Sequence, residues 1–121
     1  MLGFRLESQN ATKPQKRFCS DIGYVLHSSE EKIIPVDGRV YIETDIKFYF
    51  PFGYFGLITP LPCLAEKSID VMVSNVQNGM DKIKVLLINN GNVDYKINCF
   101  DQIAFMIITK FHDHWLLLEN K

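Results

Sequence analysis

The sequence predicts an all-β domain, and two kinds of observation carry that prediction. Apolar and polar residues alternate along several short stretches, which is the pattern of a strand with one buried and one solvated face. Turn-forming residues separate these stretches at roughly ten-residue intervals, as expected for the short strands of a β-barrel or β-sandwich. No part of the 121 residues shows a convincing helical period. We therefore expect a single domain over residues 1–121.

Residues 40–50 form the longest alternating stretch. The apolar residues share one parity and are expected to face the core, whereas the residues between them are expected to face water. The core side is Val40, Ile42, Ile46, Phe48 and Phe50, and the water side is Tyr41, Glu43, Asp45, Lys47 and Tyr49. We predict one strand over residues 40–50.

Shorter stretches predict the remaining elements. Branched and aromatic residues, or a brief alternation, favour strands elsewhere in the chain. The best helical candidate, residues 62–68, is long enough for at most a turn or two. The further strands are expected over residues 2–6, 83–88, 95–97 and 103–111.

Turn chemistry separates these elements. Asp37-Gly38 and the Asn-Asn-Gly-Asn run at residues 89–92 are hairpin signals, because Asn, Asp and Gly tolerate positive φ. Pro51 is expected to end the long strand, since proline has no N–H for a sheet ladder.

Composition and charge exclude several classes of protein. Hydrophobic residues make up 47% and charged residues 22%, which is ordinary for a globular domain. Lys and Arg total 13 against 14 for Asp and Glu, so no basic surplus indicates a nucleic-acid partner. No apolar run approaches the ~20 residues that span a membrane, and the first ten residues are too polar for a signal peptide. We expect an intracellular protein with no nucleic-acid or membrane partner.

The cysteines and histidines do not indicate a metal centre. Cys19, Cys63 and Cys99 are scattered and odd in number, without zinc spacing, and are predicted to be reduced thiols. His112 and His114 would share one face of a strand, so a metal site there is conceivable. Surface histidines near a terminus explain the pair more simply, and we expect no metal site.

Several fragments, in order along the chain, resemble the motifs of the trimeric dUTPase family. Residues 50–60, followed by Leu64-Ala65 and Ile69-Asp70, resemble the second motif, P-x-G-x-Y/F-G-R-I-x-P-R-S-G-L-A, and its downstream I-D. Residues 23–28 resemble the first motif, G-Y-D-L-Y-S, and residues 84–107 resemble the V-x-L-x-N-x-G strand and the fourth motif, G-D-R-I-A-Q-L-I. The resemblance covers nearly the whole chain. It implies a dUTPase-like distorted jelly-roll β-barrel that forms a homotrimer.

The first two motifs lack their polar site residues. The family's first-motif Asp, which holds water on the Mg²⁺ of the bound triphosphate, corresponds to Val25. The second-motif Arg-Ser-Gly, which cradles phosphate, corresponds to Leu61, Pro62 and Cys63. Leucine offers an anion no charge, and proline has no N–H to donate. At Cys63 we expect a buried, inert thiol rather than a reactive one.

The third motif is altered as well. The family's water-activating Asp falls at Val76 or Gln77 here, and the Tyr that packs under deoxyribose falls near Gly79. This stretch is about one residue shorter than the motif. Asp81 is the only carboxylate nearby, and it is the candidate for a displaced general base.

The fourth motif keeps its acidic residue but not its phosphate contact. Asp101 is retained and is expected to make a turn or intersubunit hydrogen bonds. The phosphate-contacting Gln corresponds to Phe105. The family's glycine-rich C-terminal arm has no counterpart, because the sequence ends with residues 112–121.

These changes together predict a non-catalytic dUTPase-like protein without a cofactor. The similarity is closest to dUTPases of large DNA viruses, and the adenoviral early-region proteins derived from dUTPase are a precedent. The expected role is therefore binding of a host or cellular protein, in the host cytoplasm or nucleus. Two alternatives remain. One is a divergent, Mg²⁺-dependent dUTPase that converts dUTP to dUMP and pyrophosphate, alone or with an intact relative. The other is a protein that binds dUTP without turnover.

Three features are candidate contact sites. Tyr41 and Tyr49 lie on the expected wet side of the long strand, where they can anchor a partner or pair across strands. Residues 115–118 (Trp-Leu-Leu-Leu) are too apolar for water and are expected to pack within the trimer. The terminal Lys121 does not suit a PDZ pocket, which takes an apolar last residue.

Overall fold

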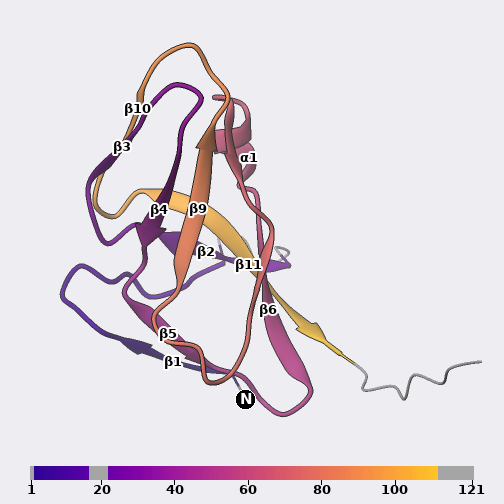
Figure 1. Ribbon diagram of the computed structural model, residues 1–121. Helices are drawn as coiled ribbons and strands as arrows, with labels where there is room; N and C mark the ends of the chain where they lie inside the picture. Colours follow the sequence, from indigo (N-terminus) through magenta and orange to yellow (C-terminus); the bar gives the residue numbers. More distant parts are fainter. Residues whose placement is uncertain (1, 17–21, 112–121) are drawn as a thin grey trace, which may run out of the picture.

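The computed structural model describes residues 2–16 and 22–111, and in them it confirms the all-β fold (Figure 1). The strands form four small antiparallel sheets that do not join into one closed barrel. Helix α1 (Pro62–Ala65) lies between β6 and β7. The strands are β1 (Gly3–Leu6), β2 (Gly23–His27), β3 (Lys32–Ile34), β4 (Arg39–Glu43), β5 (Ile46–Tyr49), β6 (Tyr54–Thr59), β7 (Ile69–Val71), β8 (Ser74–Val76), β9 (Lys84–Asn89), β10 (Tyr95–Ile97) and β11 (Gln102–Lys110).

The sheets are built around two central strands. In the largest sheet, of order β2-β11-β6-β8, β11 pairs with β2 on one side and with β6 on the other. In the second sheet, of order β4-β9-β7, β9 is central. The pairs β1-β5 and β10-β3 complete the fold. β11 passes through the middle of the molecule and β4 runs beside β9 (Figure 1).

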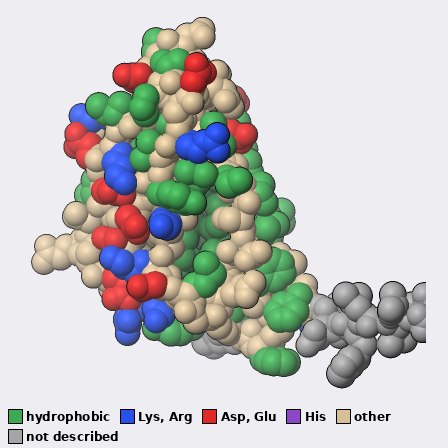
Figure 2. Space-filling model, viewed as in Figure 1, with side chains coloured by type: hydrophobic (Ala, Val, Ile, Leu, Met, Phe, Trp, Pro, Cys, Tyr) green, Lys and Arg blue, Asp and Glu red, His purple; other side chains and the backbone are tan. Residues whose placement is uncertain are grey.

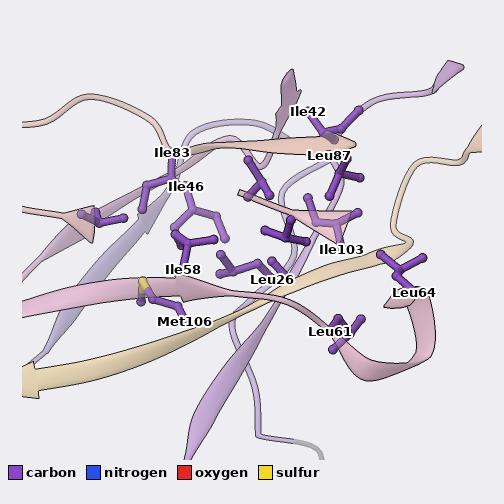
Figure 3. Packing of buried hydrophobic residues seen from close by; sticks show 14 of the residues in the cluster. Leu26, Ile42, Ile46, Ile58, Leu61, Leu64, Ile83, Leu87, Ile103 and Met106 are labelled. Atoms are coloured by element: carbon purple, nitrogen blue, oxygen red, sulfur yellow. The ribbon is translucent and has the colours of Figure 1, made fainter. Parts of the chain in front are cut away.

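The hydrophobic core lies between these two sheets (Figure 3). Leu26, Ile58 and Met106 of the larger sheet are 0% exposed, as are Ile42 and Leu87 of the smaller one. Burying a side chain of this size stabilises the fold by about 1.5–3 kcal/mol. The core therefore fixes the two sheets on which the candidate site is built.

The stretch at residues 40–50 has the predicted parity but forms two strands. Ile42 and Ile46 on the core side are buried, while Tyr41 is half exposed. The break falls at Thr44 and Asp45, where Asp45 has a φ of 55°. As a result, β4 pairs with β9 whereas β5 pairs with β1. The prediction of one continuous strand is wrong, because alternation persists across a break that keeps the parity.

The predicted turns are present, but none of them joins a hairpin. Asp37, with a φ of 60°, leads from β3, which pairs with β10, to β4, which pairs with β9. Residues 89–92 lead from β9 to β10, and Pro51 precedes the turn from β5 to β6. Each turn therefore carries the chain between sheets. Local sequence sets the φ angles of a turn and not the partner of the strand that follows.

The remaining predicted elements are found with small shifts. β9, β10, β11 and α1 match the predicted ranges closely, and β1 lies within residues 2–6. In β1, Phe4 is 39% and Leu6 43% exposed in the chain taken alone. The described residues include no helix long and apolar enough to cross a membrane.

Candidate functional site

The segment between β8 and β9 is held at its first half by Asn78. The Phe50 N–H donates to Asn78 Oδ1 at 2.7 Å, and Asn78 Nδ2 donates to the Phe50 carbonyl at 2.7 Å. The amide side chain thus pairs with the main chain as a neighbouring strand residue would. Gly79 follows with a φ of 88°, a backbone conformation that favours glycine.

The second half of this segment is held at Ile83. The Ile83 N–H donates to the Ile46 carbonyl at 2.9 Å. The Ile83 carbonyl accepts from the Thr44 N–H at 3.1 Å and from Thr44 Oγ1 at 2.7 Å. The backbone at the break between β4 and β5 is therefore hydrogen-bonded to the end of the segment that carries Asp81.

A cavity of about 240 Å³ lies between this segment and β4. Among its described lining residues, Asp81 is the carboxylate, Tyr41 is the aromatic ring, and Lys82 and Lys84 supply ammonium groups. Asp81 is exposed, and its Oδ1 accepts from the Lys82 N–H at 2.8 Å. A carboxylate at the mouth of a cavity can take a proton from water, and ammonium groups can contact an anion.

The two lysines of the cavity have different neighbours. Lys82 Nζ lies 3.6 Å from Asp45 Oδ1. Lys84 Nζ lies 4.6 Å from the centroid of the Tyr41 ring, within the range of a cation–π contact. The Tyr41 ring is therefore placed by β4 and by Lys84 together.

The structure separates the predicted pocket positions into two groups. Val25 on β2 and Phe105 on β11 are directly opposite each other in the largest sheet. Val76 and Gln77 lie at the end of β8, on the far side of β6. Gly79 is in the same segment. Of the third-motif positions only Val76 lines the cavity with Asp81, whereas Gln77 lines a second cavity, and Val25 and Phe105 do not line the Asp81 cavity.

The first- and second-motif positions pack into the fold. Val25 is 1% and Leu61 0% exposed. The Val25 N–H donates to the Gln15 carbonyl at 2.7 Å. Pro62 and Cys63 are exposed in the first turn of α1. The expectation of a buried Cys63 is wrong, because the short helix presents its first turn to solvent.

Asp101 forms the turn that the sequence predicts. Its Oδ2 accepts from the Asn98 N–H at 2.8 Å, and its own N–H donates to the Asn98 carbonyl at 3.1 Å. The Asp101 carbonyl accepts from the Ser28 N–H at 2.8 Å. Asp101 therefore shapes the entry to β11 and ties it to the end of β2.

A second cavity, of about 450 Å³, lies beside the β5–β6 turn and the end of β8. It is lined by amide side chains, which include Gln77, and by the aromatic residues Phe52, Tyr54, Phe55 and Phe111. Phe52 is fully exposed. Sequence patterns gave no sign of this cavity, because its walls come from the β5–β6 turn, β8 and the end of β11.

The structure shows the position of some other predicted features, and the rest lie outside the described residues. Tyr49 is exposed, with Lys47 Nζ 5.7 Å from its ring centroid. Cys63 and Cys99 are free thiols. Residues 2–16 and 22–111 hold no group of three or more His, Cys, Asp or Glu residues that could bind a metal ion. Cys19, His112, His114 and residues 115–118 lie outside the described residues.

Sequence comparison relates the chain to curated enzymes. The profile of the dUTPase family matches residues 9–121. The chain is 34% identical over 105 residues to the probable deoxyuridine 5'-triphosphate nucleotidohydrolase of Schizosaccharomyces pombe, which covers 85% of this chain and 75% of the relative. It is 31% identical to the Saccharomyces cerevisiae enzyme of that name, with 93% and 78% covered. The cowpox virus enzyme is 32% identical, with 90% and 75% covered.

Structure comparison gives the same fold. The dUTPase of Staphylococcus aureus phage phi11, in a structure concerned with the coordination of a structural Mg(II) ion, matches with a TM-score of 0.92 at 21% identity. The match covers 100% of this chain and 97% of that one. The phage 80alpha dUTPase with dUpNHpp matches with a TM-score of 0.93 at 19% identity, covering 100% and 89%.

These comparisons correct two expectations. A non-catalytic protein that binds host proteins is contradicted by relatives named as dUTP nucleotidohydrolases over most of the chain, poxviral ones included. The expectation rested on the altered residues of the motifs and the missing arm taken together, whereas Asp81, the candidate for a displaced base, lines a cavity beside the third-motif segment. The expected absence of a cofactor is likewise contradicted, since the phi11 relative is described with Mg(II).

Proposed function

The chain belongs to the dUTPase family, and we propose that it is a divergent dUTP nucleotidohydrolase that converts dUTP and water to dUMP and pyrophosphate. The observation that carries the proposal is its 31% identity to the Saccharomyces cerevisiae enzyme over 93% of the chain. In the balanced reaction, water adds its oxygen to phosphorus, the bridge between the α- and β-phosphates breaks, and pyrophosphate leaves.

Asp81 is the residue that we assign to activation of water. It is the carboxylate among the described residues of the 240 Å³ cavity, and it lies at the solvent boundary. A positioned general base contributes about 10²–10⁴-fold to a rate. The two anchors at Asn78 and Ile83 support this assignment, because they fix the segment on both sides of Asp81.

The cavity size suits the nucleoside part of the substrate. Pockets for drug-sized ligands hold about 300–1,000 Å³, so a cavity of about 240 Å³ is matched to a smaller group. The triphosphate would then extend toward solvent, near the ammonium groups of Lys82 and Lys84. Ammonium groups bind phosphate oxygens as point charges.

Magnesium fits the described part of the chain only as part of the substrate. Residues 2–16 and 22–111 form no cluster of protein ligands for a metal, and the first-motif position is the buried Val25. Mg²⁺ commonly keeps several waters and is held by substrate phosphates with few protein ligands. We therefore propose that Mg²⁺ enters as the dUTP complex.

We also propose that the protein acts as a homotrimer. Phe4 and Leu6 of β1 are exposed, and β1 pairs with β5 alone in the described residues. Hydrophobic side chains run through the middle and lower right of the surface in Figure 2, beside a region richer in charges. Exposed apolar patches of this kind mark interaction surfaces. Sedimentation of the purified protein tests the trimer.

Pyrophosphate release from dUTP tests the proposed function. The purified protein, at high concentration with MgCl₂, is compared with Asp81→Asn prepared identically, and with dCTP and dTTP as substrates. We expect release from dUTP alone, reduced by about 10²-fold or more in Asp81→Asn. Absence of pyrophosphate release by the wild type would contradict the proposed reaction. Equal release by Asp81→Asn would contradict the role of Asp81.

A further inference from the structure

Residues 77–80 form a tight turn that is closed by a methionine sulfur. The Gln77 N–H donates to Met80 Sδ at 3.2 Å, and the Met80 N–H donates to the Gln77 carbonyl at 3.4 Å. Gly79, the third residue of the turn, has a φ of 88°, which favours glycine at that position. Asp81 follows directly. The sulfur of Met80 therefore helps to fix the backbone from which the Asp81 carboxylate extends.

The Met80 side chain is open to solvent on this turn. It is 48% exposed and lines the 240 Å³ cavity together with Asp81. Met106, by contrast, is 0% exposed and shielded within the core. Hydroperoxides oxidise an accessible methionine to its sulfoxide, and dedicated reductases reverse the reaction. Met80 thus combines access to an oxidant with a hydrogen bond accepted by the atom that is oxidised.

We infer that Met80 is a redox-sensitive positioning residue, and that its oxidation by a hydroperoxide opens the turn at residues 77–80 and displaces Asp81. With hydrogen peroxide, the O–O bond breaks and one oxygen forms a bond to sulfur through a sulfur lone pair. The other oxygen leaves as water, so sulfur is oxidised and the peroxide is reduced. The effect on turnover rests on the proposed function, whereas the opening of the turn does not.

Oxidation removes the acceptor that the Gln77 N–H uses. A thioether sulfur accepts weakly through its lone pairs, whereas a sulfoxide sulfur carries a partial positive charge and a polar oxygen. Gln77 is exposed, so water replaces the lost acceptor and global stability changes little. The placement of Asp81 changes instead, because the bonds at Asn78 and Ile83 hold the segment only on either side of it.

Met72 is the matched control for Met80. It is 51% exposed and lies in the connection between β7 and β8. Its N–H donates to the Leu86 carbonyl at 3.0 Å, but within residues 2–16 and 22–111 its sulfur accepts no hydrogen bond. It does not line the cavity that holds Asp81. The two methionines therefore share exposure and differ in what the sulfur contacts.

The experiment treats the full chain with hydrogen peroxide. Peptide mass spectrometry locates the sulfoxides, amide hydrogen exchange followed by NMR reports on the Gln77 N–H, and steady-state kinetics with dUTP measures kcat and KM. Met80→Leu and Met72→Leu remove one sulfur each at similar side-chain size, and each protein is compared with its own untreated sample. Methionine sulfoxide reductases with dithiothreitol, set against dithiothreitol alone, separate methionine oxidation from oxidation of the exposed Cys63.

We expect peroxide to act on the wild type through Met80. The Gln77 amide should exchange about 2- to 10-fold faster, as expected for one lost hydrogen bond. The kcat should fall by about tenfold or more with a smaller change in KM, because a misplaced group reacts slowly. Met72→Leu should respond as the wild type does, and the reductases should reverse both effects. Met80→Leu should exchange this amide faster before treatment and change no further with peroxide.

The outcomes separate this inference from the proposed function. A Met80 sulfoxide with unchanged exchange at Gln77 would overturn the opening of the turn. Faster exchange with an unchanged kcat, or an equal loss of kcat in treated Met80→Leu, would overturn the link between Met80 and Asp81. Absence of pyrophosphate release by the untreated wild type would overturn the proposed function alone, because amide exchange still tests the turn.

Discussion

The side chain of Asn78 pairs with the main chain of Phe50 through two hydrogen bonds of 2.7 Å, one in each direction. The pair joins the β8–β9 segment to the residue that follows β5, across 28 positions of the sequence. A reciprocal pair of this kind restrains both the position and the rotation of the segment. Asp81, three residues further on, depends on it for its place in the cavity.

Replacement of Asn78 by Ala is expected to lower both stability and turnover. The loss of two hydrogen bonds should reduce the free energy of unfolding by roughly 1–3 kcal/mol. Misplacement of Asp81 should lower kcat by about 10- to 100-fold with a smaller change in KM. Urea unfolding and steady-state kinetics measure the two effects.

Asn92→Ala is the matched control for Asn78→Ala. Asn92 is an exposed asparagine in the turn after β9, away from the cavity, and its replacement should change neither quantity appreciably. Asn78→Asp keeps the acceptor for the Phe50 N–H and loses the donor, so it should fall between the wild type and Asn78→Ala. An Asn78→Ala protein with the wild-type kcat would show that the segment is held by other means.

The sequence predicted the fold class and some of the elements, because those depend on local pattern, but it did not predict strands β2, β3, β6, β7 and β8. Parity over residues 40–50 identified the buried side correctly, and β10 was placed at its observed bounds. The break at Thr44 and the pairing of Asn78 with Phe50 depend on partners far along the chain. The sequence next to Thr44 or Asn78 gives no indication of these distant partners.

The candidate site was predicted only in part for a similar reason. Motif resemblance located the third-motif segment and Asp81, but Tyr41 enters the cavity from β4, which belongs to another sheet. Judging function from the altered motif positions, Val25 and Leu61 among them, led to the wrong expectation of an inactive protein. Those positions are packed in the fold, and the cavity is elsewhere.

Thr44→Val is expected to destabilise the protein through the lost hydroxyl. Thr44 is fully buried, and its Oγ1 donates to the Ile83 carbonyl at 2.7 Å. Valine keeps the shape and removes the donor, which should cost about 1–2 kcal/mol in urea unfolding. Thr44→Ser retains the hydroxyl and should recover most of the hydrogen-bond contribution. Equal losses in the two variants would assign the effect to packing of the methyl group instead.

Stability should fall in mildly acidic solution because of His27. Burial lowers the pKa of His27 from its ordinary value of 6.5, and Nδ1 is buried without a hydrogen-bond partner among the described residues. The unfolded chain therefore binds a proton more readily than the folded one. The contribution of neutral His27 to the free energy of unfolding is present above pH 6.5. It is lost as the pH falls through the lower, folded-state pKa.

The His27→Gln variant isolates this effect from other titrations. The difference in unfolding free energy between wild type and variant should shift in favour of the variant as the pH is lowered from about 7.5 to 5. Urea midpoints at each pH measure the difference. A pH-independent difference would mean that His27 is protonated equally well in both states.

Restoring the family's charged residues should damage this protein rather than improve it. Leu61 and Val25 are 0% and 1% exposed, so Leu61→Arg or Val25→Asp places a charge where the wild type packs a hydrocarbon side chain. A buried charge without a partner costs about 3–5 kcal/mol. We expect a lower thermal midpoint and no gain in kcat for dUTP.

Cys63→Ser, at an exposed neighbouring position, should leave the midpoint within the range of ordinary surface changes. If Leu61→Arg keeps the wild-type midpoint and raises kcat, then the α1 turn can present a cation to phosphate, and the assignment of the site to the Asp81 cavity alone is wrong.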